Sequence, residues 1–300
     1  MTGALLAASA NCVPHTTFHV STVQAAILGV TQGLTEFIPV SSSGHLILVP
    51  WAFGWKAVYC AKEGNKFFDV ALHIGTFVGA ALYLRRDLWI LIRAFFASIA
   101  ARSVRTHEQR MAWYLVFATI PAALVGAALE SPITDHLGKP WQIAIFLALF
   151  GALLYVVDKR SAQQTPYEDM NRNQALGMGL AQTLALAPGV SRSGATITTA
   201  RAMGVTRDGA ARFSFLLSLP ITLGAALYSA TKLGNSGGLN GQGTQFAVGI
   251  LFSGVSGAFA VWGVLRLIRT RSYGDFALYR VLAAAAILIV IATGVRPGSF

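Results

Sequence analysis

The chain has 300 residues, of which 54% are hydrophobic and only 12% are charged. A water-soluble protein would carry about a quarter charged residues, so the composition argues against a soluble enzyme. The net charge of +11 does not indicate nucleic acid as a partner, because Lys and Arg cluster between apolar stretches, as they do in integral membrane proteins. We therefore predict a single all-α polytopic membrane domain over residues 1–300.

The first apolar run, 21–36, predicts a helix of about 24 Å, which is too short to cross the hydrocarbon. A polar break at 39–43 and a second short run at 44–53 follow it. Two half-length helices around a polar break are typical of a re-entrant hairpin, because such a break must be buried in protein or line a wet cavity. A second hairpin is predicted from 174–187 and 194–204, on either side of a break at 188–193.

The other apolar runs predict the remaining helices. A short run at 87–101 contains Arg93 and predicts an interfacial helix rather than a span. Six runs are long enough to cross the membrane: 66–84, 111–130, 140–157, 209–231, 245–268 and 276–294.

The second hairpin repeats the first. At a shift of 150 residues, seven pairs are identical: Gly29/Gly179, Gln32/Gln182, Leu34/Leu184, Val40/Val190, Ser41/Ser191, Ser43/Ser193 and Gly44/Gly194. We therefore predict internal repeats over about 21–157 and 172–294. Each repeat holds one hairpin and three spans, so the second enters the membrane from the opposite side. This is an inverted-topology repeat, whose broken helices typically meet near the bilayer midplane.

The distribution of basic residues predicts the orientation. The segments 85–110, 158–173, 201–212 and 266–280 hold 16 of the 23 Lys and Arg residues, and the opposite side holds six. The positive-inside rule therefore places these four segments in the cytoplasm and both chain ends outside. The first hairpin then enters from outside and the second from the cytoplasm.

Glu36 is the acidic residue that falls inside a predicted hairpin. Gln32 lies four residues before it, so the two share a helix face. An ionisable group at this depth is a candidate functional residue by default. The alternative is that Glu36 only caps or pairs with a neighbouring group.

Arg192 is the matching cation in the second hairpin, and an inverted repeat would let it approach Glu36. Its planar guanidinium suits phosphate oxygens. Hydroxyl groups lie beside it at Ser191, Ser193 and Thr196. Because a helix begins after this break, we predict an anion site there. A purely structural Glu36–Arg192 ion pair is the alternative.

His45 follows three consecutive serines, Ser41, Ser42 and Ser43, and begins the other half-helix. We interpret it as functional, whereas His73, inside a span, is interpreted as a satisfied interior histidine. A carboxylate, an imidazole, an arginine and hydroxyl groups together suit cleavage of a phosphoanhydride. The signature of soluble-type lipid phosphatases is S-R-x-x-x-x-x-H. Ser191 and Arg192 match its first two residues, but Thr198 stands at the histidine position. That mechanism therefore lacks its second histidine here.

Two segments, Q-G-L-T-E-F-I-P-V-S-S-S-G-H at 32–45 and P-G-V-S-R-S-G-A-T at 188–196, resemble the signatures of the undecaprenyl-diphosphate phosphatase family of the bacitracin-resistance type. The resemblance covers nearly the whole chain. It implies inverted repeats with re-entrant hairpins in the bacterial inner membrane and an active site open to the periplasm. It also implies removal of the terminal phosphate from undecaprenyl (C55) diphosphate, which regenerates the carrier lipid for peptidoglycan synthesis.

Carried over to this sequence, the resemblance implies catalytic roles for Glu36, Ser42, His45 and Arg192. It implies substrate binding by Gln32, Ser41, Ser43, Ser191, Ser193 and Thr196. Arg192 would clamp the diphosphate. Ser42 is the preferred nucleophile, with His45 as its base or as the acid for the leaving group, and His45 as direct nucleophile is the rival.

Gln32 stands where many relatives have Glu, which weakens a metal site with two carboxylates. Mg²⁺ or Ca²⁺ could still bind through Glu36 and the substrate phosphates. Cys12 and Cys60 both fall outside in this topology, so a disulfide between them is an open alternative. Membrane lipids surround the protein in every interpretation, and a homodimer is one assembly compatible with it. The alternative function is a secondary transporter or lipid flippase that uses the same midplane site, because inverted repeats with broken helices also build transporters.

Overall fold

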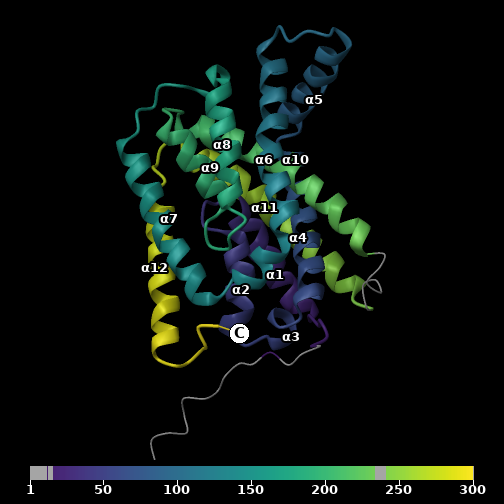
Figure 1. Ribbon diagram of the computed structural model, residues 1–300, viewed down its shortest axis with the longest axis vertical. Coiled ribbons are helices and arrows are strands. Elements are labelled where there is room, and N and C mark those ends of the chain that lie inside the picture. The colour runs from purple at the N-terminus through teal and green to yellow at the C-terminus, as the bar shows by residue number, and fades with distance from the viewer. Residues whose placement is uncertain (1–11, 13–15, 234–240, 300) are drawn as a thin grey trace, which may run out of the picture.

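The computed structural model describes residue 12 and residues 16–233 and 241–299; the rest of the predicted domain lies outside the described residues. Within them the chain is helical, with one isolated bridge between Thr165 and Val205 and no strand (Figure 1). The helices are α1 (Thr22–Phe37), α2 (Ser42–Phe53), α3 (Lys56–Tyr59), α4 (Lys62–Tyr83), α5 (Arg85–Ala100), α6 (His107–His136), α7 (Pro140–Arg160), η1 (Tyr167–Asp169), α8 (Arg172–Leu184), α9 (Arg192–Ala202), α10 (Arg207–Leu233), α11 (Gly243–Leu267) and α12 (Gly274–Ala292).

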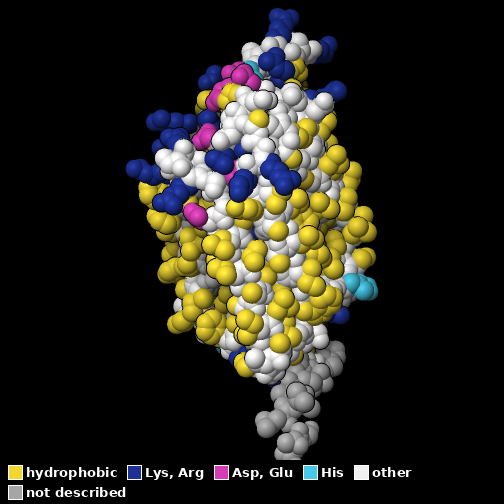
Figure 2. Space-filling view, turned by 90° about the vertical axis from the view of Figure 1, so that its left-hand side faces the viewer, with side chains coloured by type: hydrophobic (Ala, Val, Ile, Leu, Met, Phe, Trp, Pro, Cys, Tyr) yellow, Lys and Arg dark blue, Asp and Glu magenta, His cyan; other side chains and the backbone are white. Residues whose placement is uncertain are grey.

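By length and composition, five helices among the described residues can each cross a membrane: α6, α7, α10, α11 and α12. The helix predicted at 66–84 is present as α4, but it passes this test only together with α5, from which it is bent by 87°. Figure 2 shows a belt of apolar side chains with Lys and Arg gathered at one end. Leu124 and Val255, each 66% exposed, belong to this apolar surface. The protein is therefore an all-α polytopic membrane protein.

The two predicted hairpins are the pairs α1–α2 and α8–α9. Both first helices begin with a capping box, in which Ser21 and Asn171 each bond the third residue of the helix. Both second helices begin after a serine in the left-handed region, Ser41 at φ 78° and Ser191 at φ 75°. Each of these serines accepts a hydrogen bond from the backbone N–H three residues later. The two breaks therefore share one local geometry.

The first helix of each hairpin packs on a helix from the other half of the chain. A Cβ atom at Gly29 in α1 would lie 2.7 Å from the carbonyl oxygen of Gly249 in α11. A Cβ atom at Gly179 in α8 would lie 2.4 Å from the carbonyl oxygen of Ala118 in α6. Glycine at these equivalent positions permits the close backbone approach that membrane helices use. In each half, the first hairpin helix thus packs on a helix of the other half, as expected of a duplicated chain. The repeat boundaries and the inverted orientation stay predictions.

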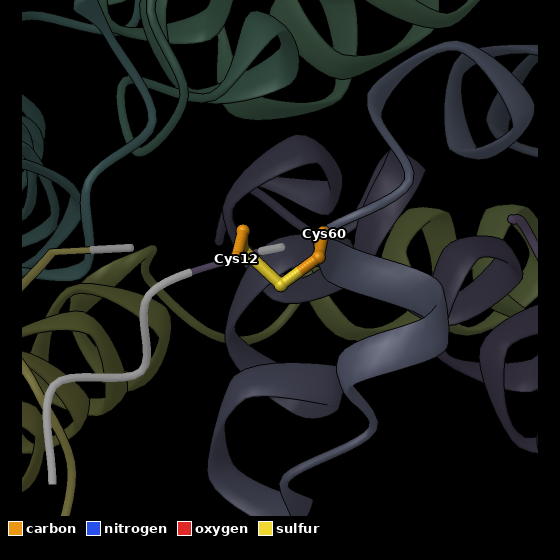
Figure 3. Close-up of a disulfide and its surroundings, with 2 residues drawn as sticks. All are labelled: Cys12 and Cys60. Carbon is orange, nitrogen blue, oxygen red and sulfur yellow. A yellow bond between two sulfur atoms is a disulfide. The ribbon is translucent and has the colours of Figure 1, made fainter. Parts of the chain in front are cut away.

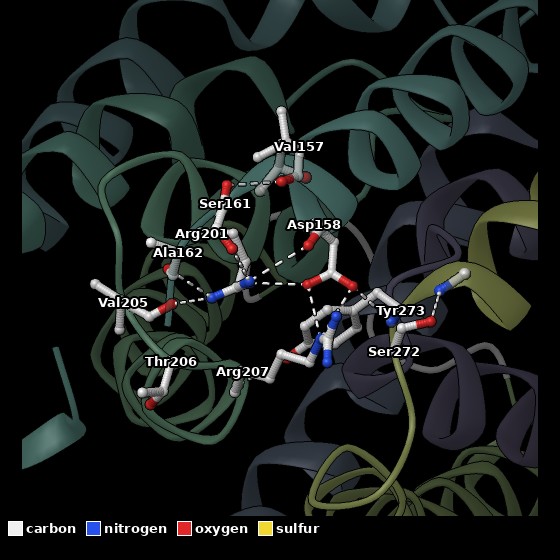
Figure 4. Close-up of polar contacts among 12 residues, drawn as sticks. Val157, Asp158, Ser161, Ala162, Arg201, Val205, Thr206, Arg207, Ser272 and Tyr273 are labelled. Carbon is white, nitrogen blue, oxygen red and sulfur yellow. Dashed lines mark hydrogen bonds and ion pairs between the residues drawn. The ribbon is translucent and has the colours of Figure 1, made fainter. Parts of the chain in front are cut away.

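A buried charged cluster joins the ends of several helices (Figure 4). The Asp158 carboxylate accepts hydrogen bonds from Arg201 at 2.8 Å, Arg207 at 2.9 Å and the Tyr273 backbone N–H at 3.1 Å. It therefore draws together three of the four segments predicted to share one side of the membrane. Nearby, Arg212 pairs with Asp87 at 2.6 Å and adds the fourth segment.

The opposite end carries the disulfide between Cys12 and Cys60, with an S–S distance of 2.02 Å (Figure 3). This is the pairing that the sequence left open. Near the C-terminus, the Trp51 indole N–H donates to the Pro297 carbonyl at 2.9 Å. Segments predicted on the same side thus lie together at each end of the molecule.

The Gly33→Ala substitution should destabilise the fold, because α1 and α11 touch there. The added Cβ would lie 2.5 Å from the carbonyl oxygen of Ser253 and 2.6 Å from the backbone nitrogen of Gly257. Overpacking of this kind costs about 1–3 kcal/mol. The matched control is Gly224→Ala in α10, where a new Cβ would meet nothing within 4 Å. Thermal unfolding in detergent should show a lower midpoint for Gly33→Ala only, and equal midpoints would contradict this packing.

Candidate active site

The breaks of the two hairpins are in direct contact. The Gly189 backbone N–H donates to the Ser41 hydroxyl at 3.0 Å, and the Ser193 hydroxyl donates to the Ile38 carbonyl at 3.3 Å. The breaks therefore satisfy each other's polar groups away from lipid, as irregular backbone at membrane depth requires.

Glu36 is the centre of the polar contacts at this junction. Its side chain is 6% exposed. One oxygen, Oε1, lies 2.5 Å from Nη2 of Arg192. The other, Oε2, accepts hydrogen bonds from the Ser42 hydroxyl at 2.5 Å and from the Gln32 amide at 2.9 Å. The carboxylate thus joins α1, α2 and α9 through charge-assisted bonds.

His73 of α4 also reaches this carboxylate. Its Nε2 lies 3.5 Å from Oε2 of Glu36, and its Nδ1 lies 2.7 Å from the backbone carbonyl of Asp69. The sequence interpretation of His73 as a satisfied interior residue misses this contact. The available signal was its position inside a span, which marks an ionisable residue as a functional candidate.

These side chains open into a cavity of about 240 Å³. One wall is polar and includes Glu36, Ser42, Ser43, His73, Ser191 and Arg192. The other is mostly apolar and comes from α4 and α10, with Val70, Ile221, Thr222, Ala225 and Ala226. Such a cavity suits a ligand that is charged at one end and apolar along its length.

Two polar atoms beside Glu36 are buried without a hydrogen-bond partner, namely Gln32 Oε1 and Arg192 Nη1. A buried polar atom without a partner is costly unless a water molecule or a ligand satisfies it. Arg192 Nη1 is a free donor on a guanidinium already held in place by Glu36, so it is available to an anionic oxygen.

The structure thus brings together Glu36, Ser42, Ser43, Ser191 and Arg192 of the predicted residues, with Gln32 next to them. Ser41 and Ser193 connect the two breaks. Thr196 lies one turn after Arg192 in α9. Its hydroxyl lies 2.9 Å from the Arg192 carbonyl and 2.7 Å from the Ser214 hydroxyl, and it does not line the cavity.

His45 does not line the cavity. Its Nδ1 lies 2.7 Å from the Ser41 carbonyl and its Nε2 lies 2.7 Å from the hydroxyl of Tyr279 in α12. The His45 imidazole therefore lies away from the contact between Glu36 and Arg192, because the first turn of α2 directs it toward α12. A catalytic role for His45 stays a prediction.

The described residues contain no group of three or more His, Cys, Asp or Glu side chains that could hold a metal ion. Both carboxylate oxygens of Glu36 are already bonded to Arg192, Ser42 and Gln32. These residues therefore do not form a metal site by themselves.

The arrangement can perform nucleophilic chemistry on an anion. Ser42 donates its proton toward a carboxylate, which is the relation of a nucleophile to its general base. Ser42 and Arg192 also lie in the first turns of α2 and α9, whose N–H groups have no acceptors within the helix. Two helix N-termini and a guanidinium at one point favour negative charge.

Fold and site together define a polytopic membrane protein in which two helical hairpins meet at one cavity. The chain matches the family model "Bacitracin resistance protein BacA" over residues 25–286. It is 42% identical to the undecaprenyl-diphosphatase of Pelobacter propionicus over 274 residues, covering 91% of this chain and 98% of the relative. Identity to the undecaprenyl-diphosphatase of Geobacter metallireducens is 43%, with 90% and 98% covered, and to that of Nocardioides sp. 39%, with 91% and 97% covered. The chain belongs to the bacitracin resistance protein BacA family.

The Glu36–Arg192 pair should show strong energetic coupling. Removing one partner leaves a buried charge uncompensated and costs about 3–5 kcal/mol, so Arg192→Leu alone should destabilise the protein markedly. Adding Glu36→Gln should restore part of that stability, because the lone carboxylate is then gone. A double-mutant cycle of unfolding free energies in detergent measures this coupling. Additive effects of the two changes would contradict a direct pair.

Proposed function

We propose that this protein hydrolyses undecaprenyl diphosphate to undecaprenyl phosphate and inorganic phosphate. The observation that carries the proposal is the junction of Ser42, Glu36 and Arg192 on one cavity, built from both hairpins. The diphosphate would occupy the polar wall, and the polyprenyl chain would extend along the apolar wall toward lipid. The names of the relatives support this substrate, and they give no support to the transporter or flippase alternative.

In the first step, Ser42 Oγ attacks the terminal phosphorus while Glu36 accepts its proton. The bond from that phosphorus to the bridging oxygen breaks, and undecaprenyl phosphate leaves. Glu36 gives this proton to the departing phosphate oxygen or to solvent and is ionised again. In the second step, Glu36 takes a proton from a water molecule that attacks the phosphoserine. The bond from phosphorus to Ser42 Oγ breaks, inorganic phosphate is released, and Glu36 returns the proton to Oγ. Arg192 Nη1 and the first-turn N–H groups would stabilise the charge on the phosphoryl oxygens.

His45 enters this scheme differently from the sequence prediction. Glu36, rather than His45, lies 2.5 Å from the Ser42 hydroxyl, so we assign the role of base to Glu36. Because the His45 imidazole contacts Ser41 and Tyr279, direct attack by His45 would require it to leave both partners.

Mg²⁺ or Ca²⁺ would reach the site with the substrate, held mainly by phosphate oxygens together with Glu36. Such binding agrees with the usual behaviour of Mg²⁺, which takes one or two carboxylates and the substrate phosphates. No step above depends on the cation.

We further propose that the protein works in the inner membrane of a bacterium, with its cavity reached from the periplasm. There it would return the carrier lipid to peptidoglycan synthesis and so confer resistance to bacitracin. The gathering of basic residues at one end supports this orientation through the positive-inside rule. The inverted-topology repeat and a homodimer remain predictions.

A covalent intermediate on Ser42 is the most specific expectation of the mechanism. Purified protein should release phosphate from undecaprenyl diphosphate, and Ser42→Ala should lose this activity by orders of magnitude. Rapid acid quenching with substrate labelled in the terminal phosphate should trap an acid-stable label on the parent, as expected of phosphoserine. The matched control is Ser98→Ala, a buried serine that contacts Phe95 and Trp113 far from the cavity. An acid-labile label that survives in Ser42→Ala would instead indicate a phosphohistidine and refute this assignment.

The orientation can be tested by cysteine labelling after Cys12 and Cys60 have been replaced by serine. In spheroplasts, a membrane-impermeant maleimide should label Lys139→Cys but not Arg105→Cys, because these exposed positions lie on opposite sides in the proposed topology. Permeabilised cells should label both. Labelling of Arg105→Cys alone in spheroplasts would reverse the orientation.

A further inference from the structure

Arg280 is a fully buried cation on a helix that is exposed along its opposite face. Its helix, α12, lies at the edge of the molecule (Figure 1), where Leu278 and Leu282 are 58% and 59% exposed. Arg280 itself is 0% exposed. The positive-inside count of the sequence grouped it with the segment 266–280, but its side chain points into the protein. A buried arginine at this depth is costly, so its partners indicate what it does.

The Arg280 guanidinium contacts the breaks of both hairpins. Nη1 donates to the carbonyl of Pro39 at 3.1 Å, in the break between α1 and α2. Nη2 donates to the carbonyls of Gly189 at 3.0 Å and Val190 at 2.9 Å, in the break between α8 and α9. The remaining contacts are with the α7 carbonyls of Leu147 and Phe146, at 3.2 Å and 3.4 Å. One side chain of α12 therefore joins α7 and the two irregular segments.

All five acceptors are neutral carbonyl groups. Among the ion pairs of the described residues none involves Arg280, whereas the other fully buried arginine, Arg201, is paired with Asp158. An ordinary buried arginine is stabilised by a carboxylate. Arg280 instead satisfies carbonyls that the two breaks leave without helical partners, which matches the five N–H donors of a guanidinium.

The neighbouring helices leave room for this side chain. A Cβ atom at Gly151 in α7 would lie 3.0 Å from Cβ of Arg280, and one at Gly194 in α9 would lie 2.7 Å from its Nη1. Glycine at both positions therefore admits the stem and the head of Arg280. Gly194 lies two residues after Arg192, so the guanidinium lies directly behind the first turn of α9.

Holding these carbonyls also fixes the amides that follow them, because a peptide group is planar. The plane that contains the Val190 carbonyl contains the N–H of Ser191, and the plane of the Pro39 carbonyl contains the N–H of Val40. Ser191 is one of the two serines in the left-handed region, and Val40 immediately precedes the other, Ser41. A non-glycine residue with this conformation persists only when its surroundings hold it.

We propose that Arg280 is a positioning residue of the phosphatase site. It fixes the two breaks from behind, so that Ser42 and Arg192 are presented to the same phosphoryl group without Arg280 touching the substrate. The inference rests on the proposed function for its effect on turnover, but its structural part is independent of it. Loss of Arg280 should therefore loosen both breaks at once.

The test compares Arg280→Gln and Arg280→Lys with the parent protein in detergent. The matched control is Arg201→Gln, which removes an equally buried arginine from the charged cluster around Asp158. Phosphate release gives kcat and KM, and hydrogen exchange measured by mass spectrometry gives the protection of 38–44 and 188–194. Lysine keeps the charge but presents a single ammonium, which cannot span both breaks as the planar guanidinium does.

Arg280→Gln should lower kcat by about a hundredfold with a much smaller change in KM, as expected when reacting groups are displaced by about 1 Å. Exchange should rise in both segments, and Arg280→Lys should show the same pattern more weakly. If Arg280→Gln does not fold, Arg280→Lys supplies the same two readouts. Arg201→Gln should retain the parent kcat per folded molecule and the protection of both segments.

Parent-like turnover and protection in Arg280→Gln would overturn the proposal. Equal losses in Arg201→Gln would overturn it too, because they would indicate general destabilisation. If the parent releases no phosphate, the proposed function fails, while the exchange measurement still decides whether Arg280 holds the two breaks.

Discussion

A carboxylate at membrane depth needs a partner that compensates its charge, and the contact between the two hairpins supplies one for Glu36. Its partner, Arg192, lies 156 residues further along the chain, in the other hairpin. The ion pair forms only if the two hairpins meet, and this requires both helices to break inside the protein. An unpartnered charge at this depth would cost several kcal/mol, so the pair also ties the position of one hairpin to that of the other.

The breaks themselves follow from the same constraint. Each exposes backbone groups that lipid cannot satisfy, and each is satisfied by the opposite hairpin and by Arg280. The result is a polar junction in which two helix N-termini, a guanidinium and a serine hydroxyl surround one cavity. The contacts that make irregular backbone tolerable in the membrane therefore also bring Ser42, Glu36 and Arg192, the residues proposed to act on the diphosphate, to one cavity.

Much of this arrangement was predictable because it depends on local pattern. Composition predicts the membrane class, and the polar breaks at 39–43 and 188–193 predict the hairpins. The duplication predicts that Glu36 and Arg192 approach each other, and their 2.5 Å contact confirms it. The loops predicted to share a membrane side lie together in the structure. The length of each apolar run predicts where a helix ends, and the Lys and Arg content of each loop predicts the side on which it ends.

The remaining features depend on which neighbour a side chain meets, and helical periodicity does not determine that. His45 follows the hydroxyl cluster in sequence, yet its ring lies against Tyr279. The sequence predicts an interior histidine at His73, whereas α4 brings its Nε2 to 3.5 Å from Oε2 of Glu36. Arg280 lies near a basic loop in the sequence, yet its guanidinium contacts the two breaks in the interior of the protein. Its long side chain can reach about a helical turn away from its backbone position.

The most direct test of the account is the turnover of undecaprenyl diphosphate at saturating substrate by the parent protein and by Arg192→Lys. The account predicts that the parent releases phosphate and that the lysine variant loses at least about a hundredfold in kcat, because an ammonium cannot bind Glu36 and a phosphoryl oxygen with the geometry of the guanidinium. A folded parent that is inert with Mg²⁺ or Ca²⁺ present, or an Arg192→Lys variant with the parent rate, would contradict it.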